Sequence, residues 1–155
     1  MQICKTEIQL LCKEALDLPE FAGSTIRGAF GNILKQTACV QPNTSCQHCM
    51  MRKRCVYTYL FESGWYFSSG NRVQSGVPQP FVFEPPTTLN ISKGGEIRLG
   101  LLLYGDAIDY LAYFTYCFTR LGQWGLGRNR SPFELERILD AFDNYAPVIR
   151  ENGVD

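Results

Sequence analysis

The sequence is poor in long apolar runs and in charge, and it contains a single histidine. No apolar stretch approaches the roughly 18 residues that a membrane-spanning helix needs, and no signal-peptide pattern opens the chain. Charged side chains make up 19% of the residues and hydrophobic ones 45%, a balance that excludes an intrinsically disordered chain. With 155 residues, the chain is expected to form one domain around its own core, without a membrane partner.

The formal net charge is zero, which argues at first sight against a nucleic-acid binder held mainly by phosphate contacts. The charge is nevertheless unevenly spread. Residues 1–130 carry 13 basic and 9 acidic side chains, a net +4, whereas residues 131–155 carry 2 and 6, a net −4. A nucleic-acid surface is therefore not excluded, but it has to be local.

The seven cysteines are an odd number and follow no secretion signal, which indicates a reducing cytoplasm rather than a disulfide framework. Four of them crowd into residues 39–55, with the spacing Cys39-x6-Cys46-x2-Cys49-x5-Cys55. Four thiolates at this spacing favour a structural zinc ion, and an iron–sulfur cluster is the alternative. The remaining three lie in apolar patterns and are expected to be core residues: Cys4, Cys12 and Cys117.

Alternation of apolar and polar residues predicts strands at 4–13, 81–83 and 96–104, and again from residue 133. A helix is predicted to begin at Ser24, with a buried stripe at Ile26, Phe30, Ile33 and Leu34. Gly28 and Gly31 leave another side of this helix bare, which predicts a close approach, either by the sheet or by a nucleic-acid backbone.

A second helix is predicted over residues 107–121, with Asp106 and Asp109 as a capping pair and Gly122 as its stop. Residues 63–80 are rich in Gly, Ser and Pro and predict a mobile loop. The order strand–helix–strand–strand–helix–strand predicts an α+β fold of the ferredoxin-like βαββαβ type, with the cysteine-rich segment as a metal-binding insertion.

Residues 122–130 read Gly122-Gln-Trp124-Gly125-Leu-Gly127-Arg128-Asn-Arg130. In one interpretation the glycine backbone approaches an anion, Arg128 and Arg130 bind phosphate, and Trp124 stacks on a base. In the other, the glycines only permit a tight helix-to-strand connection. A dinucleotide fingerprint is excluded, because this loop follows a helix and precedes a strand.

Taken in order, several segments resemble the CRISPR-associated RAMP superfamily, and within it the pre-crRNA-processing endoribonucleases that carry a cysteine loop. The segments are "GSTIRGAFG", the Cys-x6-Cys-x2-Cys-x5-Cys-x-Tyr loop, "PFVFEPP", "GLLLYGDA" and "LGQWGLGRNRSPFEL". The resemblance covers about residues 3–140. It implies an RRM-related domain at 1–140 whose glycine-rich loop binds CRISPR repeat RNA. By motif, that role falls on Gly122, Gly125, Gly127, Arg128 and Arg130, with Arg27 as a further basic residue near the RNA.

Such proteins usually have two of these domains in tandem, so residues 141–155 are expected to be a linker or the start of a missing C-terminal ferredoxin-like domain. The family cleaves RNA without metal, often with a histidine as general base. His48 is the one histidine here, and its position in the cysteine loop favours a solvent-facing or metal-supporting role over catalysis. Lys35 and Tyr57 are substitutes that nothing in the sequence selects.

The resemblance implies a part in metal-independent RNA cleavage, and the missing second domain leaves room for a chain that is inactive by itself. The alternative is a non-catalytic scaffold in a CRISPR effector complex, which docks other CRISPR-associated proteins through the cysteine loop and aromatic residues 65–67. The adjacent Arg52, Lys53 and Arg54 are either a basic surface fixed by the metal or a solvated run of charge.

Overall fold

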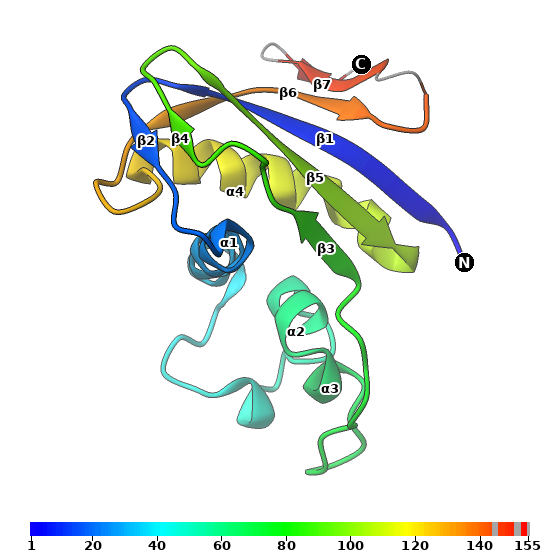
Figure 1. The fold of residues 1–155 in the computed structure, drawn as a ribbon. Coiled ribbons are helices and arrows are strands. Elements are labelled where there is room, and N and C mark those ends of the chain that lie inside the picture. Colours follow the sequence, from blue (N-terminus) through cyan, green and yellow to red (C-terminus); the bar gives the residue numbers. More distant parts are fainter. Residues whose placement is uncertain (144–145, 151–152, 155) are drawn as a thin grey trace.

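The computed structural model describes residues 1–143, 146–150 and 153–154. It has a mixed α/β architecture in which helices cover one face of an antiparallel sheet (Figure 1). The long central strands are β1 (Ile3–Cys12) and β5 (Glu96–Tyr104), flanked by β3 (Phe81–Glu84) and β6 (Phe133–Asp140). The strand order is β3-β5-β1-β6, continued at the β6 edge by β7 (Ala146–Arg150) and β8 (Gly153–Val154). Two short strands, β2 (Leu16–Asp17) and β4 (Asn90–Ile91), pair separately.

Alternation along the strands decides which face is buried. In β1, Thr6, Ile8, Leu10 and Cys12 are buried, and in β5 the buried side chains are Ile97, Leu99, Leu101 and Leu103. The predicted strands at 4–13, 81–83 and 96–104 are confirmed within one or two residues. The prediction that Cys12 and Cys117 are core residues is also confirmed, whereas Cys4 is only half-buried.

Helix α1 (Ala22–Ala38) buries the predicted stripe. It begins two residues before the predicted Ser24, and no side chain caps its N-terminus. At Gly31 a Cβ atom would lie 2.9 Å from the Phe61 ring, so a protein ring explains this glycine. No atom of the described residues lies within 4 Å of a Cβ at Gly28. The bare side of α1 is therefore covered at one glycine and open at the other.

The predicted helix over 107–121 is shifted. Residues Gly105–Tyr110 form a 3-10 turn (η2), and α4 runs over Leu111–Trp124 without a capping hydrogen bond from a side chain. Gly122 lies inside α4 rather than after it, and Gly125, with φ +91°, ends the helix. A Cβ at Gly122 would lie 2.2 Å from the carbonyl oxygen of Phe133, so this glycine allows α4 to pack closely on β6.

Between α1 and β3 the chain leaves the sheet and forms a lobe on the far side of α1 (Figure 1). The lobe contains the cysteine segment with its 3-10 turn η1 (Cys46–His48), then α2 (Val56–Phe61) and α3 (Ser63–Tyr66). The first residues of the predicted loop at 63–80 are thus helical. Residues 141–155, expected to be a linker or the start of a second domain, contain β7 and β8, while 144–145, 151–152 and 155 lie outside the described residues.

Replacing Phe30 by alanine is expected to destabilise the fold by about 3–5 kcal/mol, because the ring is fully buried and stacks on Phe114 at 4.6 Å. Urea denaturation followed by circular dichroism measures this loss. Phe142→Ala is the matched control, because its ring is 69% exposed and its removal should change the free energy of unfolding by less than about 0.5 kcal/mol. Equal effects of the two substitutions would contradict the packing described above.

Candidate nucleic-acid interface

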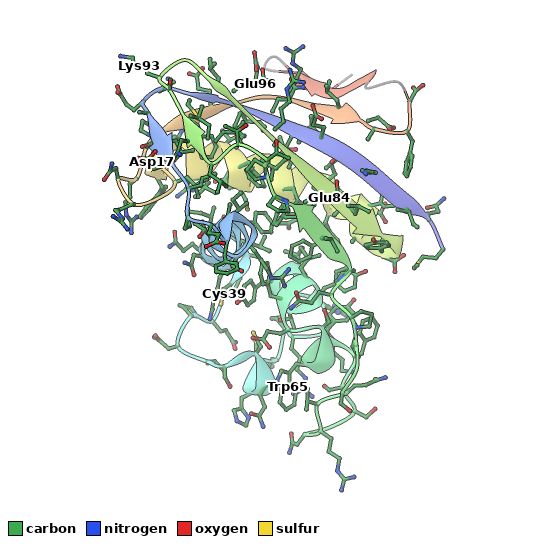
Figure 2. All side chains as sticks on the ribbon, viewed as in Figure 1. Asp17, Cys39, Trp65, Glu84, Lys93 and Glu96 are labelled. Carbon is green, nitrogen blue, oxygen red and sulfur yellow. The ribbon has the colours of Figure 1, made fainter. Side chains whose placement is uncertain are left out.

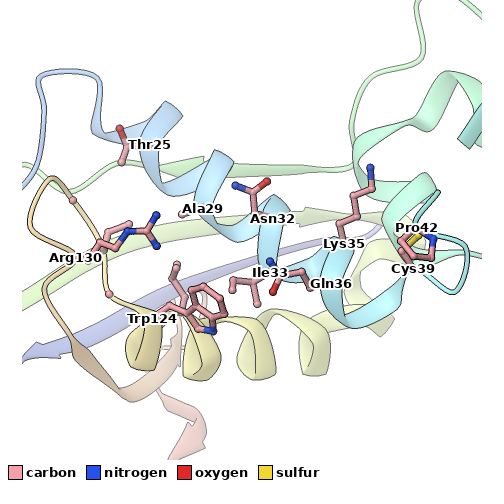
Figure 3. A pocket seen from close by; sticks show the side chains of 14 residues that line it. Thr25, Ala29, Asn32, Ile33, Lys35, Gln36, Cys39, Pro42, Trp124 and Arg130 are labelled. Carbon is pink, nitrogen blue, oxygen red and sulfur yellow. The ribbon is translucent and has the colours of Figure 1, made fainter. Parts of the chain in front are cut away.

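A groove of about 660 Å³ separates α1 from the end of α4 and the glycine-rich loop that follows it (Figure 3). The α1 wall of the groove contains Thr25, Asn32 and Gln36. These residues are about two helical turns and one helical turn apart, so they share one side of the helix. The opposite wall holds Trp124 and Arg130, whose guanidinium reaches toward α1. The remaining lining residues are Ala29, Ile33, Lys35, Cys39, Pro42, Leu121, Gly125, Leu126 and Gly127.

The glycine-rich loop is held in one shape by its own backbone. Leu126 and Ser131 exchange two hydrogen bonds of 3.0 and 2.9 Å, and the N–H of Arg130 donates to the carbonyl of Gly127 at 3.2 Å. The Ser131 hydroxyl donates to the Ala15 carbonyl at 2.6 Å and ties the loop to the end of β1. Within the described part of the chain, the N–H groups of residues 127–129 stay without an acceptor, so they are the ones available to an anion.

Close packing fixes two of the loop glycines. Gly125 has φ +91°, and a Cβ there would lie 2.1 Å from the carbonyl oxygen of Arg130. Gly127 has φ +80°, and its Cβ would lie 2.7 Å from the carbonyl oxygen of Asp17. Side chains are strained at such φ values even where space exists. Backbone packing therefore explains these two glycines, as in the tight-turn interpretation. It does not explain the two arginines.

Arg128 and Arg130 are exposed, and neither has an ion pair or side-chain hydrogen bond to any described residue. Arg130 itself has φ +47°, an unusual conformation for a residue with a side chain. Two unpaired guanidinium groups next to a groove provide the planar donors that suit phosphate. These two residues and the three glycines are thus brought together in the structure.

Arg27 lies apart from the groove. Its guanidinium carbon is 4.8 Å from the centre of the Phe81 ring and 5.1 Å from that of Phe61, and burial lowers its pKa. The structure therefore places Arg27 in a cation–π contact between α1, α2 and β3, and not with the other residues predicted to bind RNA.

All four clustered cysteines line a second cavity, of about 210 Å³, between the end of α1, α2 and the cysteine segment. The N–H of Cys49 donates to the carbonyl of Cys46 at 3.3 Å, which closes a tight turn between these two thiols. Burial raises the pKa of the Cys46 thiol, and a hydrogen bond with Thr58 partly offsets this. Among the described residues, no three His, Cys, Asp or Glu side chains are grouped closely enough to hold a metal ion. The thiols therefore share a cavity but do not form a ligand cluster.

His48 is exposed on this segment and does not line the groove. Lys35 does line it, although its amine lies 5.5 Å from the centre of the Tyr57 ring. Burial, with a smaller contribution from Glu62, raises the pKa of Tyr57, which makes its phenolate form still harder to reach. None of the three is presented as a base beside the glycine-rich loop.

Arg52 and Lys53 join the cysteine segment to the residues after α3. Arg52 donates to the carbonyls of Gln47 and Gly70, and Lys53 donates to that of Ser68. The Arg52 guanidinium also lies 5.9 Å from the centre of the Trp65 ring. Two of the three basic residues thus bind backbone carbonyls. The segment 52–54 is therefore neither a fully solvated run of charge nor a basic surface free to bind a ligand.

Sequence reasoning missed the polar wall of α1, formed by Thr25, Asn32 and Gln36. Their helical spacing opposite the apolar stripe is visible in the sequence, but nothing local shows that this side faces a loop about 100 residues further on.

No described helix is both long and apolar enough to cross a membrane.

Several known proteins are similar to this chain, and three of them are described below. An uncharacterized protein of Archaeoglobus fulgidus is 33% identical over 125 residues, which are 80% of this chain and 42% of that protein. The chain therefore spans less than half the length of this relative. A chain in the crystal structure of the Csm3–Csm4 subcomplex of the type III-A CRISPR-Cas interference complex superposes with a TM-score of 0.57 at 12% identity, covering 88% of this chain and 76% of that one. The third is a Cas6 product complex, with a TM-score of 0.45 at 19% identity and coverages of 87% and 39%.

The similarity to the Csm3–Csm4 chain shows a shared fold. Membership of a sequence family is shown separately, because a family model described as AF_1859_N, N-terminal domain, matches residues 1–154. On this match, the chain belongs to the AF_1859_N family of N-terminal domains.

Proposed function

We propose that this chain is an RNA-binding domain of the CRISPR-associated RAMP type, which binds CRISPR repeat RNA at the glycine-rich loop. The observation that carries the proposal is the composition of the groove beside this loop. Arg130 and Lys35 line it, and no carboxylate does so among the described residues. A phosphate backbone finds positive charge there without the repulsion that a nearby carboxylate would add.

The fold supports the same proposal. Helix α1 connects β1 to β3, α4 connects β5 to β6, and the strand order is β3-β5-β1-β6. We propose that this arrangement is a ferredoxin-like βαββαβ fold with the cysteine segment as an insertion after α1, and the strand order supports the assignment. The shared fold with a chain of the Csm3–Csm4 subcomplex agrees with a RAMP-type domain.

The chain is proposed to be the N-terminal part of a longer RNA-processing protein. The family is described as an N-terminal domain, and the relative from Archaeoglobus fulgidus is more than twice as long as the matched region. In the proposed reaction, a 2′-oxygen attacks the adjacent phosphorus, the bond to the 5′-oxygen breaks, and that oxygen takes up a proton. The general base would then come from the remainder of the protein, because His48 lies outside the groove and Lys35 lies over the Tyr57 ring.

A non-catalytic scaffold subunit is the second candidate. The location of His48, exposed and away from the groove, favours it, and so does the shared fold with a subunit of an interference complex. The two candidates agree on RNA binding and differ only in whether RNA is cut.

The four cysteines are proposed to hold a structural zinc ion. The support is that all four line one cavity and that Zn²⁺ prefers thiolate ligands, although the thiols would have to close further around the ion. When bound, the ion would cross-link α1, the segment after it and α2. An iron–sulfur cluster remains the alternative for the same four thiols.

Replacing Arg128 and Arg130 together by alanine is expected to weaken binding of repeat RNA and to lower the slope of log affinity against log salt by about 1–2, because two phosphate contacts are lost. Fluorescence anisotropy with labelled repeat RNA at several salt concentrations measures both quantities. Lys93→Ala is the matched control, because Lys93 is an exposed cation on the β4–β5 turn, paired with Glu14. Unchanged affinity and slope in the double variant would show that the loop is not the RNA site.

Incubating the full-length protein with repeat RNA in EDTA distinguishes the two candidates. A metal-independent nuclease should leave a 2′,3′-cyclic phosphate at one position, which mass spectrometry of the products identifies. Intact RNA, bound with undiminished affinity, would support the scaffold.

The purified chain is expected to contain one zinc ion and to be colourless, as measured by elemental analysis and absorption. Removing the metal, or replacing Cys49 by serine, should expose residues 39–55 to limited proteolysis, because the segment loses its cross-link. Cys4→Ser is the matched control, since Cys4 is half-buried on β1 and outside the cavity. Bound iron would favour the cluster, and unchanged protection after metal removal would show that no metal holds the segment.

A further inference from the structure

The exposed side of α4 carries aromatic side chains that the core does not use. Tyr113, Tyr116 and Trp124 are 38%, 47% and 50% exposed. At 100° per residue they fall within about 80° of one another around the helix, and they extend about 16 Å along its axis. They therefore form a row on one side of α4, where three apolar rings meet water.

Figure 3 shows Trp124 in the groove beside α1, and Tyr113 and Tyr116 share a cavity with Thr37 of the same helix. The 660 Å³ cavity contains Trp124 at the C-terminal end of α4, and a second cavity of about 310 Å³ contains Tyr113 and Tyr116 nearer its N-terminus. Residues of α1 line both cavities: Asn32 and Gln36 are among those in the first, and Thr37 is in the second. The two cavities thus follow one another along the α1–α4 boundary.

The chemistry of this groove suits a nucleic-acid strand. Neither cavity is lined by Asp or Glu among the described residues. Arg120, one turn after Tyr116 on α4, donates to the Tyr116 hydroxyl at 3.0 Å. The side-chain amides of Asn32 and Gln36 have no hydrogen bond to any described residue, so they can both donate to and accept from base edges.

The opposite, open face of the sheet is less suited to a nucleic-acid strand, because it carries carboxylates. Among the described residues of this face, Lys5 pairs with Glu84 at 3.5 Å and Arg98 pairs with Glu96 at 2.5 Å. Figure 2 shows Glu84 on β3 and Glu96 on β5. A strand of RNA on this face would meet carboxylates and would have to displace existing ion pairs.

We infer that the α1–α4 groove binds an unpaired RNA strand whose bases stack on Trp124 and Tyr116, and that the open face of the sheet does not bind it. The inference rests on the proposed function and adds the form of the RNA and the surface it uses. The strand is unpaired because only a base outside a duplex can present its face to an aromatic ring. Arg130 and Arg128 hold phosphates at the end of the groove nearest Trp124.

The test uses the whole chain with two probes, a fluorescein-labelled single-stranded repeat RNA and the same strand annealed to its complement. Trp124→Ala and Tyr116→Ala should each weaken binding of the single strand by about 5- to 140-fold, the range measured for one stacked base. Trp124→Phe keeps a ring and should retain most of the affinity. Tyr104→Ala is the matched control on the open face of the sheet and should bind like the original chain. Thermal melts establish that each variant is folded.

A spectroscopic reading is independent of the affinities. The chain has two tryptophans, so Trp65→Phe leaves Trp124 as the only one. Stacking on a base should quench its fluorescence when the single strand is added, and the duplex should quench it less.

The outcomes separate this inference from the proposed function. If the double arginine variant loses affinity while Trp124→Ala and Tyr116→Ala do not, RNA binding stands and the stacking groove is wrong. A loss confined to Tyr104→Ala would place the RNA on the sheet. Duplex binding as tight as that of the single strand would also overturn the inference. Failure of the original chain to bind either probe would instead remove the proposed function.

Discussion

The stacking of Phe30 on Phe114, with ring centres 4.6 Å apart, sets the position of α1 against α4, and most other features follow from it. The same Phe30 ring contacts Phe61 of α2 and two rings of β3, at 5.3 to 6.0 Å. One side chain of α1 thus touches α4, the lobe and the edge of the sheet. Because interiors pack at crystal-like density, none of these elements can shift without disturbing that contact. With the buried sides of the two helices fixed in this way, their outer sides are left to form the groove.

The glycine-rich loop depends on a second constraint, which is steric. Gly122 lets α4 approach β6, Gly125 lets the chain turn back beneath Arg130, and Gly127 passes close to the carbonyl of Asp17. These contacts account for all three glycines without a ligand. They also hold the loop rigid, so that Arg128 and Arg130 project from a fixed backbone. A rigid loop loses less conformational entropy when it binds, which favours it as a binding site even though its glycines are explained by packing.

How much the sequence could predict depended on whether the deciding contact was local. The strands and the α1 stripe were correct because alternation and helical spacing are properties of neighbouring residues. Gly122 was assigned as a helix stop because a glycine that ends a helix and one that admits a neighbouring strand look the same in a sequence. Arg27 was placed near RNA, but Phe81 comes more than 50 residues later and gives it an aromatic partner. The polar wall of α1 was missed for the same reason, since the loop facing it is distant in the chain.

The zero net charge of the chain does not prevent positive charge from being concentrated locally on the described surface. On the open face of the sheet, carboxylates lie next to Lys5, Arg98 and other cations and cancel them. On the helix side, Arg128 and Arg130 have no carboxylate partner among the described residues, and the adjacent cavities have none in their lining. Over a screening length of about 8–10 Å, a phosphate at the groove is affected by the second set of charges and only weakly by the first. Zero net charge is therefore compatible with the proposed binding of RNA on one side of the chain. Cys39 lines both the groove and the cysteine cavity, so the cysteine segment adjoins that same surface.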